Sequence, residues 1–383
     1  MGFGNVQISS PTAPIWERYA DQFPVRDNLI YLNHAAVSPL PRCTAEAIRH
    51  FVDDCLHWGS LHYSEWLDVY QGVRAAAADL INCTPGEIAL VKNTSEGIAT
   101  IAMGINWKRG DRVVGFREEF PANLYPWKRL ESKGVEVTWL SITDPLERID
   151  EATRGARLLS ISFVNFLSGY RAPLQAIGEI CRRNRCIYIV DAIQGMGAFP
   201  LDVRACQIDA LAADGHKWML GPEGCGILYI NPQLQEQVEP VEFGWTNVAK
   251  YADYSSRDMT LRPDAARYEC GTLNTPGCFG LKASLEFLLE VGIEEISAAV
   301  CSHAGRIASG AQAKGYELMG RIRTPETASG IVSFRKHGAD CTEIVRLLRD
   351  RHIIAAPRAG WIRTSPHFYL SPDQIEEMVD ALP

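Results

Sequence analysis

Residues 213–226 of this 383-residue chain read Ala-Asp-Gly-His-Lys-Trp-Met-Leu-Gly-Pro-Glu-Gly-Cys-Gly. Lys217 thus stands between a histidine and a glycine-rich turn, directly before the apolar run Ile227–Ile230. A lysine in a loop is ordinarily solvated, because lysines are almost never fully buried without a partner. A solvated surface lysine is therefore the simpler interpretation of Lys217. A functional interpretation needs support from the surrounding sequence.

An aspartate at the end of a buried strand supplies that reason. Residues Cys186–Val190 form a β-branched apolar run, typical of a buried parallel strand, and Asp191 follows directly. Ligands of open α/β sheets bind at the carboxyl ends of the strands. A buried carboxylate is costly unless it meets a cation or good donors. A protonated pyridine nitrogen is such a cation, and Lys217 could bind an aldehyde on the same ring as a Schiff base.

The pairing of a strand-end Asp-x-x-Gln with a later Gly-His-Lys resembles the class V aminotransferase family of fold-type-I enzymes that depend on pyridoxal phosphate. This family includes cysteine desulfurases, cysteine C–S lyases, kynureninase and isopenicillin-N-epimerase-like proteins. The resemblance implies that Lys217 and Asp191 are catalytic, binding the cofactor's aldehyde and its ring nitrogen. It also implies that Gln194 donates to the ring oxygen and that His216 contacts the phosphate. Many relatives carry serine or alanine in place of Asp214, to which the sequence assigns no role.

The alternation of strands, loops and helices predicts an α/β fold with a mainly parallel, doubly wound sheet. The expected helices include Arg42–Trp58, Tyr63–Ile81 and Pro173–Asn184, and the expected strands Ile88–Val91, Val113–Phe116, Val135–Leu140 and Leu158–Phe163. The resemblance implies the fold-type-I architecture, with a large cofactor-binding domain at residues 31–260 and a smaller α+β domain at residues 261–383. Residues 1–30, with Trp16, Tyr19 and Phe23 at helical spacing, are expected to form a segment that packs on the small domain.

Composition and charge restrict the partners. The chain is 46% hydrophobic and 22% charged with a net charge of -8, which argues against nucleic acid or an acidic membrane surface as a partner. No apolar run approaches the ~18 residues of a membrane span. Residues 1–15 lack the basic region and apolar core of a secretory signal. We therefore expect a cytoplasmic protein.

The eleven cysteines form no Cys-x-x-Cys pair, and their odd number fits reduced thiols better than a disulfide framework. A metal site is the weaker interpretation, because His216 and Cys225 have no second ligand at a recognisable zinc spacing. We expect no metal.

Two further segments are candidates for the cofactor site. Thr94 and Ser95 begin a helix after the strand Ile88–Val91, where free N–H groups and the helix dipole favour a phosphate, although an ordinary N-cap explains the same residues. Phe120 aligns with the histidine that stacks on the pyridine ring in desulfurases. An aromatic ring can stack equally well, and a core phenylalanine is the alternative.

Two positions rest mainly on the family resemblance. Val164–Gly169 resembles the Val-Asn-x-x-(Thr/Ser)-Gly turn of kynureninase-like members, so Asn165 is a candidate to bond the ring oxygen or the substrate, with an Asx-turn as the competing explanation. Residues 269–274 resemble the Glu-x-Gly-Thr-x-Asn loop, which crosses a dimer interface in the family. The resemblance thus implies a homodimer in which Thr272 reaches the partner's cofactor phosphate.

The expected substrate is an amino acid. Arg363 stands before a Ser-Pro turn and offers a fork for a carboxylate; in the family this arginine binds the substrate α-carboxylate, and a surface arginine is the alternative. Trp361 and Arg358 are expected to shape the side-chain pocket. The family's opening segment lines the substrate entrance, which makes His34 and Ala35 candidates; a helix-entry turn with an exposed histidine is the competing interpretation.

The expected type of reaction rests on a cysteine that this sequence lacks. Desulfurases carry a nucleophilic cysteine on a loop shortly before the substrate arginine, whereas residues 352–361 contain no cysteine and leave only a short loop. We therefore expect a cysteine C–S lyase in which Lys217 removes the Cα proton and the β-substituent is eliminated. A class V aminotransferase or an epimerase is the alternative, and a non-catalytic protein that binds the cofactor is a remote one. A nicotinamide dehydrogenase is disfavoured, because no Gly-x-Gly-x-x-Gly follows the first strand.

Overall fold

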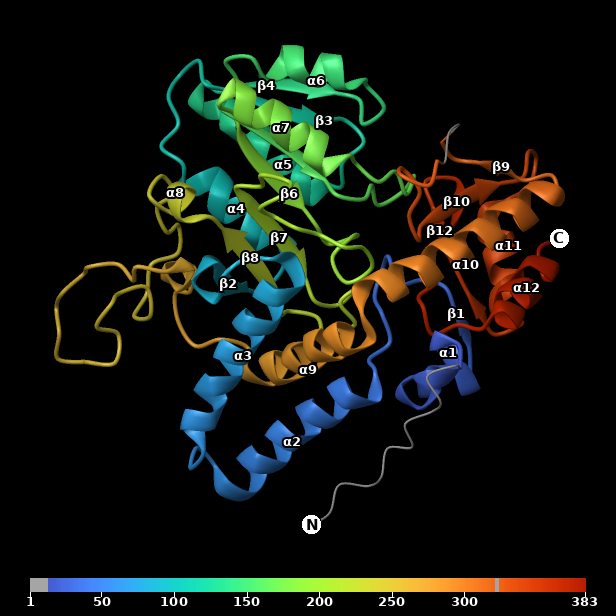
Figure 1. Ribbon diagram of the computed structural model, residues 1–383, viewed down its shortest axis with the longest axis horizontal. Coiled ribbons are helices and arrows are strands. Elements are labelled where there is room, and N and C mark those ends of the chain that lie inside the picture. Colours follow the sequence, from blue (N-terminus) through green and yellow to red (C-terminus); the bar gives the residue numbers. More distant parts are fainter. Residues whose placement is uncertain (1–12, 321–323) are drawn as a thin grey trace.

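The computed structural model describes residues 13–320 and 324–383. At its centre is a seven-stranded sheet in the order β2-β8-β7-β6-β5-β3-β4 (Figure 1). The strands are β2 (Ile88–Val91), β3 (Arg112–Phe116), β4 (Glu136–Leu140), β5 (Leu158–Ser162), β6 (Ile187–Asp191), β7 (Ala210–Asp214) and β8 (Gly226–Ile230). Strand β8 is antiparallel to both of its neighbours, and all other neighbouring strands are parallel. The mainly parallel sheet confirms the predicted fold class.

Both faces of this sheet are covered by helices, so its strands are apolar on both sides. Successive residues of β6 point to opposite faces. Ile189 packs in the apolar cluster that includes residues of α4 (Thr94–Gly104) and α5 (Tyr125–Arg129), while Val190 packs in the cluster of the opposite face. That face is covered by α3 (Tyr63–Ile81), α6 (Leu146–Thr153), α7 (Leu174–Asn184) and α9 (Thr275–Val291).

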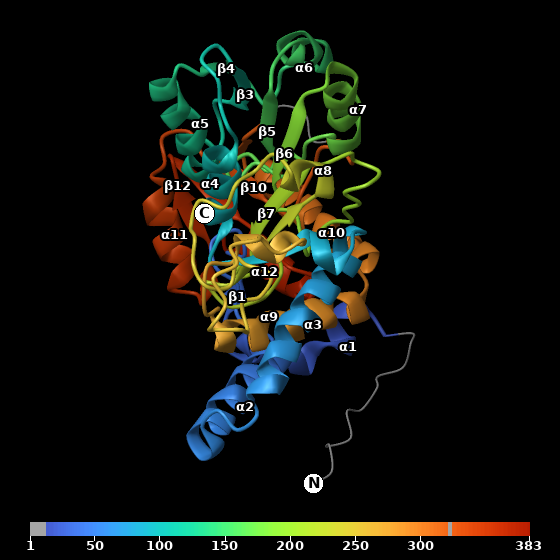
Figure 2. The same cartoon turned by 90° about the vertical axis from the view of Figure 1, so that its left-hand side faces the viewer.

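The remaining chain forms a smaller sheet and its helices. The small sheet is antiparallel, in the order β12-β13-β10-β9. Its strands are β9 (Glu317–Leu318), β10 (Val332–Arg335), β12 (Ala356–Arg358) and β13 (Trp361–Thr364), and the helices nearby are α10 (Ile293–Ala313), α11 (Cys341–Arg349) and α12 (Pro372–Asp380). Figure 2 shows α2 (Arg42–Trp58) projecting from the body of the molecule, away from the large sheet. A short helix α8 (Pro232–Gln235) follows β8, and residues 242–261 form an irregular connector.

The N-terminal segment packs against the C-terminal part of the chain. Strand β1 (Ile30–Tyr31) pairs in parallel with β11 (Ile353–Ile354), and the ring of Phe23 stacks on Tyr369 at 3.9 Å. The helical spacing of Trp16, Tyr19 and Phe23 does not correspond to one helix: α1 (Ile15–Arg18) is followed by two separate 3-10 turns, the second of which begins at Pro24. Residues 1–12, which belong to the predicted segment and to the stretch searched for a secretory signal, lie outside the described residues.

Most predicted elements match the observed ones within one or two residues, and α2, α3 and β2 match at both ends. Strand β7 was not predicted, since its sequence Ala-Leu-Ala-Ala-Asp has little of the β-branched character of a strand. Its small side chains allow α4 to pack closely: a Cβ on Gly97 would lie 2.7 Å from the Cβ of Ala212. The three domain boundaries remain predictions.

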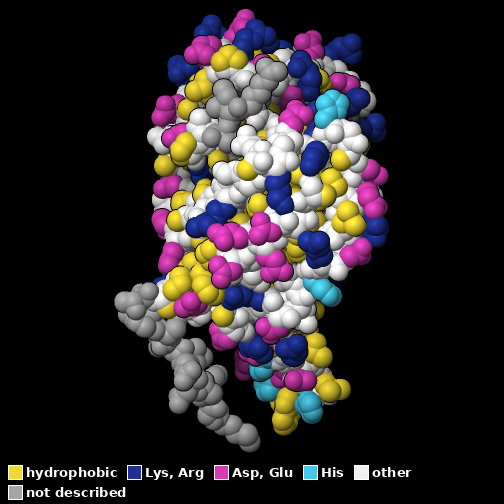
Figure 3. Space-filling model, turned by 90° about the vertical axis from the view of Figure 1, so that its right-hand side faces the viewer, with side chains coloured by type: hydrophobic (Ala, Val, Ile, Leu, Met, Phe, Trp, Pro, Cys, Tyr) yellow, Lys and Arg dark blue, Asp and Glu magenta, His cyan; other side chains and the backbone are white. Residues whose placement is uncertain are grey.

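Charges of both signs are interspersed on the face of the molecule that Figure 3 displays. Within residues 13–320 and 324–383, no helix is long and apolar enough to cross a membrane.

Candidate active site

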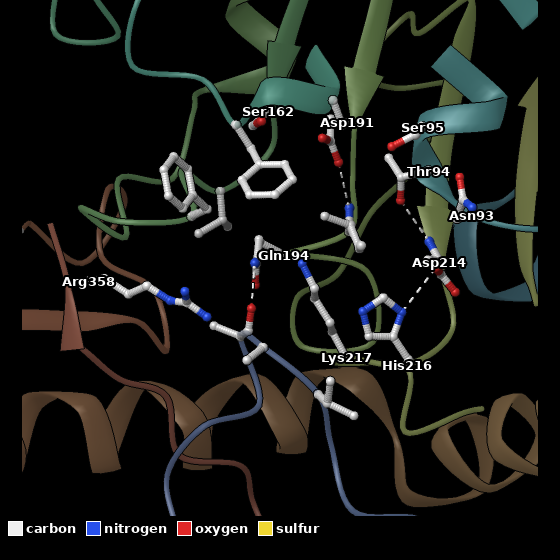
Figure 4. Close-up of a pocket in the computed structure, with 18 of the residues that line it drawn as sticks. Asn93, Thr94, Ser95, Ser162, Asp191, Gln194, Asp214, His216, Lys217 and Arg358 are labelled. Carbon is white, nitrogen blue, oxygen red and sulfur yellow. Dashed lines mark hydrogen bonds and ion pairs between the residues drawn. The ribbon is translucent and has the colours of Figure 1, made fainter. Parts of the chain in front are cut away.

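A cavity of about 440 Å³ opens at the carboxyl ends of β5, β6 and β7, the sheet edge at which the sequence places the site (Figure 4). It brings together segments that are far apart in the chain. Its polar lining comprises Asn93, Thr94, Ser95, Ser162, Asp191, Gln194, Asp214, His216, Lys217, Arg358 and Arg363, and its apolar lining includes Ala35 and Phe120.

Lys217 lies in the turn after β7 and lines the cavity, so the interpretation as a solvated surface lysine is wrong. The turn is closed by hydrogen bonds from the N–H of Gly215 to the carbonyl of Cys225 (2.9 Å) and from the N–H of Gly221 to the carbonyl of Gly215 (2.8 Å). Burial lowers the pKa of the Lys217 ammonium to about 8, although Asp191 acts in the opposite direction. A substantial share of this amine is therefore neutral near pH 7.5 and able to act as a nucleophile or base.

Asp191 ends β6 with only 2% of its surface exposed. Its carboxylate accepts a hydrogen bond from the N–H of Ile193 at 3.1 Å. Burial raises its pKa to about 6, while that N–H and the Lys217 ammonium lower it. A carboxyl group that is hard to ionise by itself is suited to a cationic partner such as a pyridinium.

Glu119 is a second buried carboxyl next to the cavity, and it was missed in the sequence. It accepts hydrogen bonds from the N–H of Ser162 at 2.6 Å and from the Ser162 hydroxyl. Ser162 is the cross-strand partner of Asp191. Burial raises the pKa of Glu119 to about 7, and the nearby Asp191 contributes in the same direction. Its position directly before Phe120 was the signal available in the sequence.

The first turn of α4 forms one wall of the cavity. Its N-cap is Asn93, whose side chain accepts the N–H of Glu96 at 2.9 Å, so the alternative of a Thr94 or Ser95 cap is wrong. The hydroxyl of Thr94 accepts the backbone N–H of Asp214 at 3.0 Å, and Ser95 is exposed to the cavity. These hydroxyls and the free N–H groups of α4 can together hold a phosphate.

Gln194 ties two walls of the cavity together, whereas Asn165 lies outside its lining. The side chain of Gln194 donates to the carbonyl of Ala35 (2.9 Å) and accepts from the indole N–H of Trp218 (2.8 Å). The side chain of Asn165 accepts the N–H of Ser168 (2.9 Å) and donates to a carbonyl at 2.7 Å. The structure therefore favours the Asx-turn interpretation of Asn165.

Phe120 is 46% exposed and lines the cavity, so it is not a core phenylalanine. Its ring contacts Phe166 edge to face at 5.3 Å, and the amine of Lys217 lies 5.8 Å from its centroid. The ring thus stands at the edge of the space beside Lys217.

Arg363 is 2% exposed, which excludes the surface arginine. One of its guanidinium nitrogens donates to the carbonyl of Phe166 at 2.8 Å. Its Nε and Nη2 are buried and have no hydrogen-bond partner within residues 13–320 and 324–383. Burial, together with the neighbouring Arg358, lowers the pKa of Arg363 to about 10. An unpaired buried guanidinium leaves two donors for an anion that enters the cavity.

Of the two residues expected to shape the side-chain pocket, Arg358 lies in the lining of the cavity and Trp361 does not. Arg358 reaches the cavity from β12 (Figure 4). The ring of Trp361 is covered instead by the guanidinium of Arg335, 4.2 Å from its centroid. Pairing of β13 with β10 places Ser333 opposite Arg363 and thereby brings Arg335 beside Trp361.

Both interpretations of His34 are wrong, because the side chain is fully buried and does not line the cavity. Its Nδ1 lies 2.7 Å from the carbonyl oxygen of Ser365, and its Nε2 lies 2.8 Å from the hydroxyl of Tyr369. Burial lowers its pKa to about 4. Ala35, by contrast, does line the cavity, and His34 fastens its segment to the end of β13.

Thr272 is exposed and lies outside this cavity, in the lining of a smaller one of about 170 Å³. Its predicted contact with a partner's cofactor stays a prediction. Among the described residues, no group of three or more histidine, cysteine or acidic side chains is arranged to hold a metal ion.

The family model for aminotransferase class-V matches residues 30–366. The chain belongs to the class-V aminotransferase family. It is 29% identical to a probable cysteine desulfurase from Methanothermobacter thermautotrophicus, over 94% of each chain. The apo structure of a cysteine desulfurase from Thermococcus onnurineus NA1 is 26% identical, covers 95% of this chain and 96% of that one, and superposes with a TM-score of 0.87. A cystine C–S lyase that is 23% identical shares the fold, with a TM-score of 0.87 over 94% and 98% of the two chains.

Membership of the class-V aminotransferase family identifies an enzyme that depends on pyridoxal phosphate. Independently of the family match, three features of the cavity fit that cofactor. Asp191 is a buried carboxyl suited to a cation, Lys217 offers a partly neutral amine, and the first turn of α4 offers donors for a phosphate. These groups line one cavity, and in the view of Figure 4 Lys217 lies below Asp191 and the first turn of α4.

Proposed function

We propose that this enzyme is a cysteine C–S lyase, which eliminates the β-substituent of a cysteine-type amino acid without a persulfide-forming cysteine. The connection between β12 and β13 carries the proposal. It consists of Ala359 and Gly360 alone, with φ of 49° and 80°, which is the geometry of a tight two-residue hairpin. No described residue in the cavity lining is a cysteine. A hairpin this short cannot extend a thiol toward the substrate, as a cysteine-bearing loop would.

The proposed roles follow from burial and charge. Arg363 binds the substrate α-carboxylate through its unpaired Nε and Nη2. Asp191 keeps the cofactor's ring nitrogen protonated, and the cofactor when bound supplies the electron sink for the reaction. Lys217 would hold the cofactor's aldehyde, and its amine would be the base that takes the proton from Cα of the substrate. Its pKa of about 8 suits a group that must both accept and return a proton near neutral pH.

The cofactor contacts of Thr94, Ser95, Phe120, Gln194 and His216 belong to the same proposal. Their support is that all five residues line the cavity that contains Lys217. Asn165 has no such support.

The test is product analysis with the purified protein and added pyridoxal phosphate. L-cysteine, L-cystine and cysteine S-conjugates are supplied separately, and pyruvate, ammonia and sulfide are measured. We expect pyruvate from at least one sulfur amino acid, no product with Lys217→Ala, and unchanged turnover with the exposed control Lys128→Ala. Turnover only in the presence of a keto acid would identify an aminotransferase, and inversion at Cα without pyruvate would identify an epimerase.

We further propose a homodimer in which Thr272 reaches the partner's cofactor phosphate. Large apolar side chains are exposed at the projecting tip of α2, where Leu56 is 74%, Trp58 61% and Leu61 68% exposed. Trp245, close to the loop of Thr272, is 43% exposed. Exposed apolar clusters of this kind are typical of interaction surfaces. Sedimentation should give twice the chain mass for the native protein and the single mass for a Leu56→Asp, Trp58→Asp variant.

A cytoplasmic location remains part of the proposal. Its support is the odd number of cysteines in the sequence, which suits a reducing compartment.

A further inference from the structure

Asn165, a candidate for a direct contact with the cofactor or the substrate, lies outside the lining of the cavity and is only 3% exposed. Its side-chain oxygen accepts the N–H groups of Leu167 at 3.2 Å and of Ser168 at 2.9 Å, and also the Ser168 hydroxyl at 2.9 Å. Its side-chain amide donates to the carbonyl of Glu118 at 2.7 Å. One side chain therefore organises the turn of residues 165–169 and ties it to the segment that follows β3.

The carbonyl groups of this turn bind the small sheet. The carbonyl of Phe166 accepts Nη1 of Arg363 at 2.8 Å. The carbonyl of Leu167 accepts the hydroxyl of Ser333, the cross-strand partner of Arg363. The carbonyl of Gly169 accepts a further hydroxyl, from the segment just before β10, at 2.7 Å. The turn thus joins the end of β5 to the small sheet, and it bonds the guanidinium of Arg363 directly.

Two neighbours of Asn165 fit this close contact. The hydroxyl of Ser168 accepts the N–H of Tyr170 at 3.2 Å, which closes the turn on its other side. Gly169 has a φ of 71°, and a Cβ there would lie 2.3 Å from the carbonyl oxygen of Ile331. A side chain at position 169 would therefore push the turn away from the small sheet, so packing sets how near the turn comes to that sheet.

The bond to Phe166 determines which part of Arg363 stays available. A guanidinium carries its five N–H groups in one rigid plane, so fixing one nitrogen restricts the directions of the others. Nη1 is taken by the Phe166 carbonyl, whereas Nε and Nη2, on the adjoining edge, are buried and have no hydrogen-bond partner among the residues that the structure describes. That edge presents two parallel N–H bonds, the arrangement that a carboxylate binds with both oxygens.

We propose that Asn165 is a positioning residue for the substrate, which acts on Arg363 through the Phe166 carbonyl and touches neither the substrate nor the cofactor. The inference rests on the proposed function, since it takes the α-carboxylate to bind Arg363. Without the Asn165 side chain the turn loses its bonds to that side-chain oxygen and its tether to Glu118, so the Phe166 carbonyl would no longer hold the guanidinium at one angle. Loss of Asn165 should therefore weaken carboxylate binding and leave the cofactor in place.

The test compares two analogues of S-methyl-L-cysteine that lack the amine and cannot join the cofactor: 3-(methylsulfanyl)propanoate and its amide, which has no carboxylate. Their dissociation constants are measured with the cofactor-loaded enzyme by quenching of tryptophan fluorescence. We expect Asn165→Ala to weaken binding of the acid about tenfold, because charge-assisted bonds lose their alignment, and to change binding of the amide and of pyridoxal phosphate by no more than about twofold. Turnover of S-methyl-L-cysteine should show a raised KM and little change in kcat.

The matched control is Asn231→Ala. Asn231 also accepts a backbone N–H, from Leu234 at 2.7 Å, and donates to another segment, at Asp209 (2.7 Å), but it does not line the cavity or contact Arg363. This variant should leave the binding of both analogues unchanged. In an Arg363→Ala background, Asn165→Ala should add no further loss, since the group that it positions is gone.

Equal weakening of the acid and the amide by Asn165→Ala would overturn the inference, and so would a full additional loss in the Arg363→Ala background. Weaker binding of pyridoxal phosphate in Asn165→Ala would also overturn it, because that result would place Asn165 at the cofactor. Absence of turnover of every sulfur amino acid by the native enzyme would instead contradict the proposed function, and the two analogue titrations would still decide the role of Asn165.

Discussion

At the scale of single residues, we propose that Arg358 selects the amino acids that the cavity accepts. Its guanidinium lines the cavity and lies close enough to Arg363 to lower the pKa of that residue. With Arg363 assigned to the α-carboxylate, Arg358 is the cation left for an anionic group on the substrate side chain, as in L-cystine with its second carboxylate.

We predict that Arg358→Ala lowers kcat/KM for L-cystine about tenfold, the loss of one exposed charge-assisted hydrogen bond, and leaves S-methyl-L-cysteine within about twofold. Steady-state pyruvate release with both substrates measures this. The reference variant is Arg363→Ala, which should impair both substrates to a similar extent. An equal effect of Arg358→Ala on the two substrates would show that Arg358 does not read the side chain.

The sequence identified those residues of the cavity for which a motif and a chemical argument agree. Asp191 was recognisable as a strand-end carboxylate and Lys217 as a lysine in a glycine-rich turn, and both line the cavity. His34 could not be interpreted correctly, because the partners that bury it, Ser365 and Tyr369, stand more than 300 positions later in the chain. The position of Trp361 could not be predicted for a related reason: the register of β10 against β13 determines which side chain covers its ring.

At the scale of elements, the contact between α4 and β7 positions the cavity wall that the first turn of α4 forms. The start of α4 was predictable, because Thr94 and Ser95 follow a strand and are typical of a helix start. Strand β7 was not predictable, because its alanines have low strand propensity and instead allow α4 to approach closely. Gly97 faces Ala212 with no room for a Cβ, which would lie 2.7 Å from the alanine methyl.

We predict that Gly97→Ala lowers the free energy of unfolding by about 1–3 kcal/mol, the usual cost of overpacking, and weakens pyridoxal phosphate binding, since α4 must move away from Asp214. Urea denaturation measures the stability, and quenching of tryptophan fluorescence on titration with pyridoxal phosphate measures the binding. Gly305 of α10 is the matched control: a Cβ there would meet nothing within 4 Å, so Gly305→Ala should stabilise the protein by up to about 1 kcal/mol. Comparable stabilities of the two alanine variants would contradict the tight packing.

At the scale of the whole molecule, buried histidines lie at the junction of the N-terminal segment, the Lys217 turn and the C-terminal part of the chain. His34 bonds Ser365 and Tyr369, His367 lies 3.3 Å from the carbonyl of Trp218, and His303 is buried on α10. Burial lowers the pKa of His34 and of His303 to about 4, and it also lowers the pKa of His367 well below its usual value. Each must stay neutral in the folded protein.

This junction should make the fold sensitive to acid. A histidine with a folded pKa of about 4 and an unfolded pKa near 6.5 binds more protons when unfolded, so its contribution to stability is present above pH 6.5 and is lost as the pH falls toward 4. The raised pKa values of Asp191 and Glu119 act in the opposite direction, because these carboxyls bind more protons in the folded state. The pH dependence of the free energy of unfolding therefore contains both contributions. Comparing the native protein with a variant that lacks one histidine isolates the contribution of that histidine.

We predict that lowering the pH from 7 to 5 reduces the free energy of unfolding of the native protein by about 2 kcal/mol more than that of His303→Leu. Urea denaturation at the two pH values, without cofactor so that Asp191 has no bound cation in either protein, measures this difference. The exposed residue His57 provides the control, since His57→Leu should retain the native pH dependence. If His303→Leu follows the native curve, the ring of His303 is not held neutral by burial, and the acid sensitivity of the junction must come from His34 and His367.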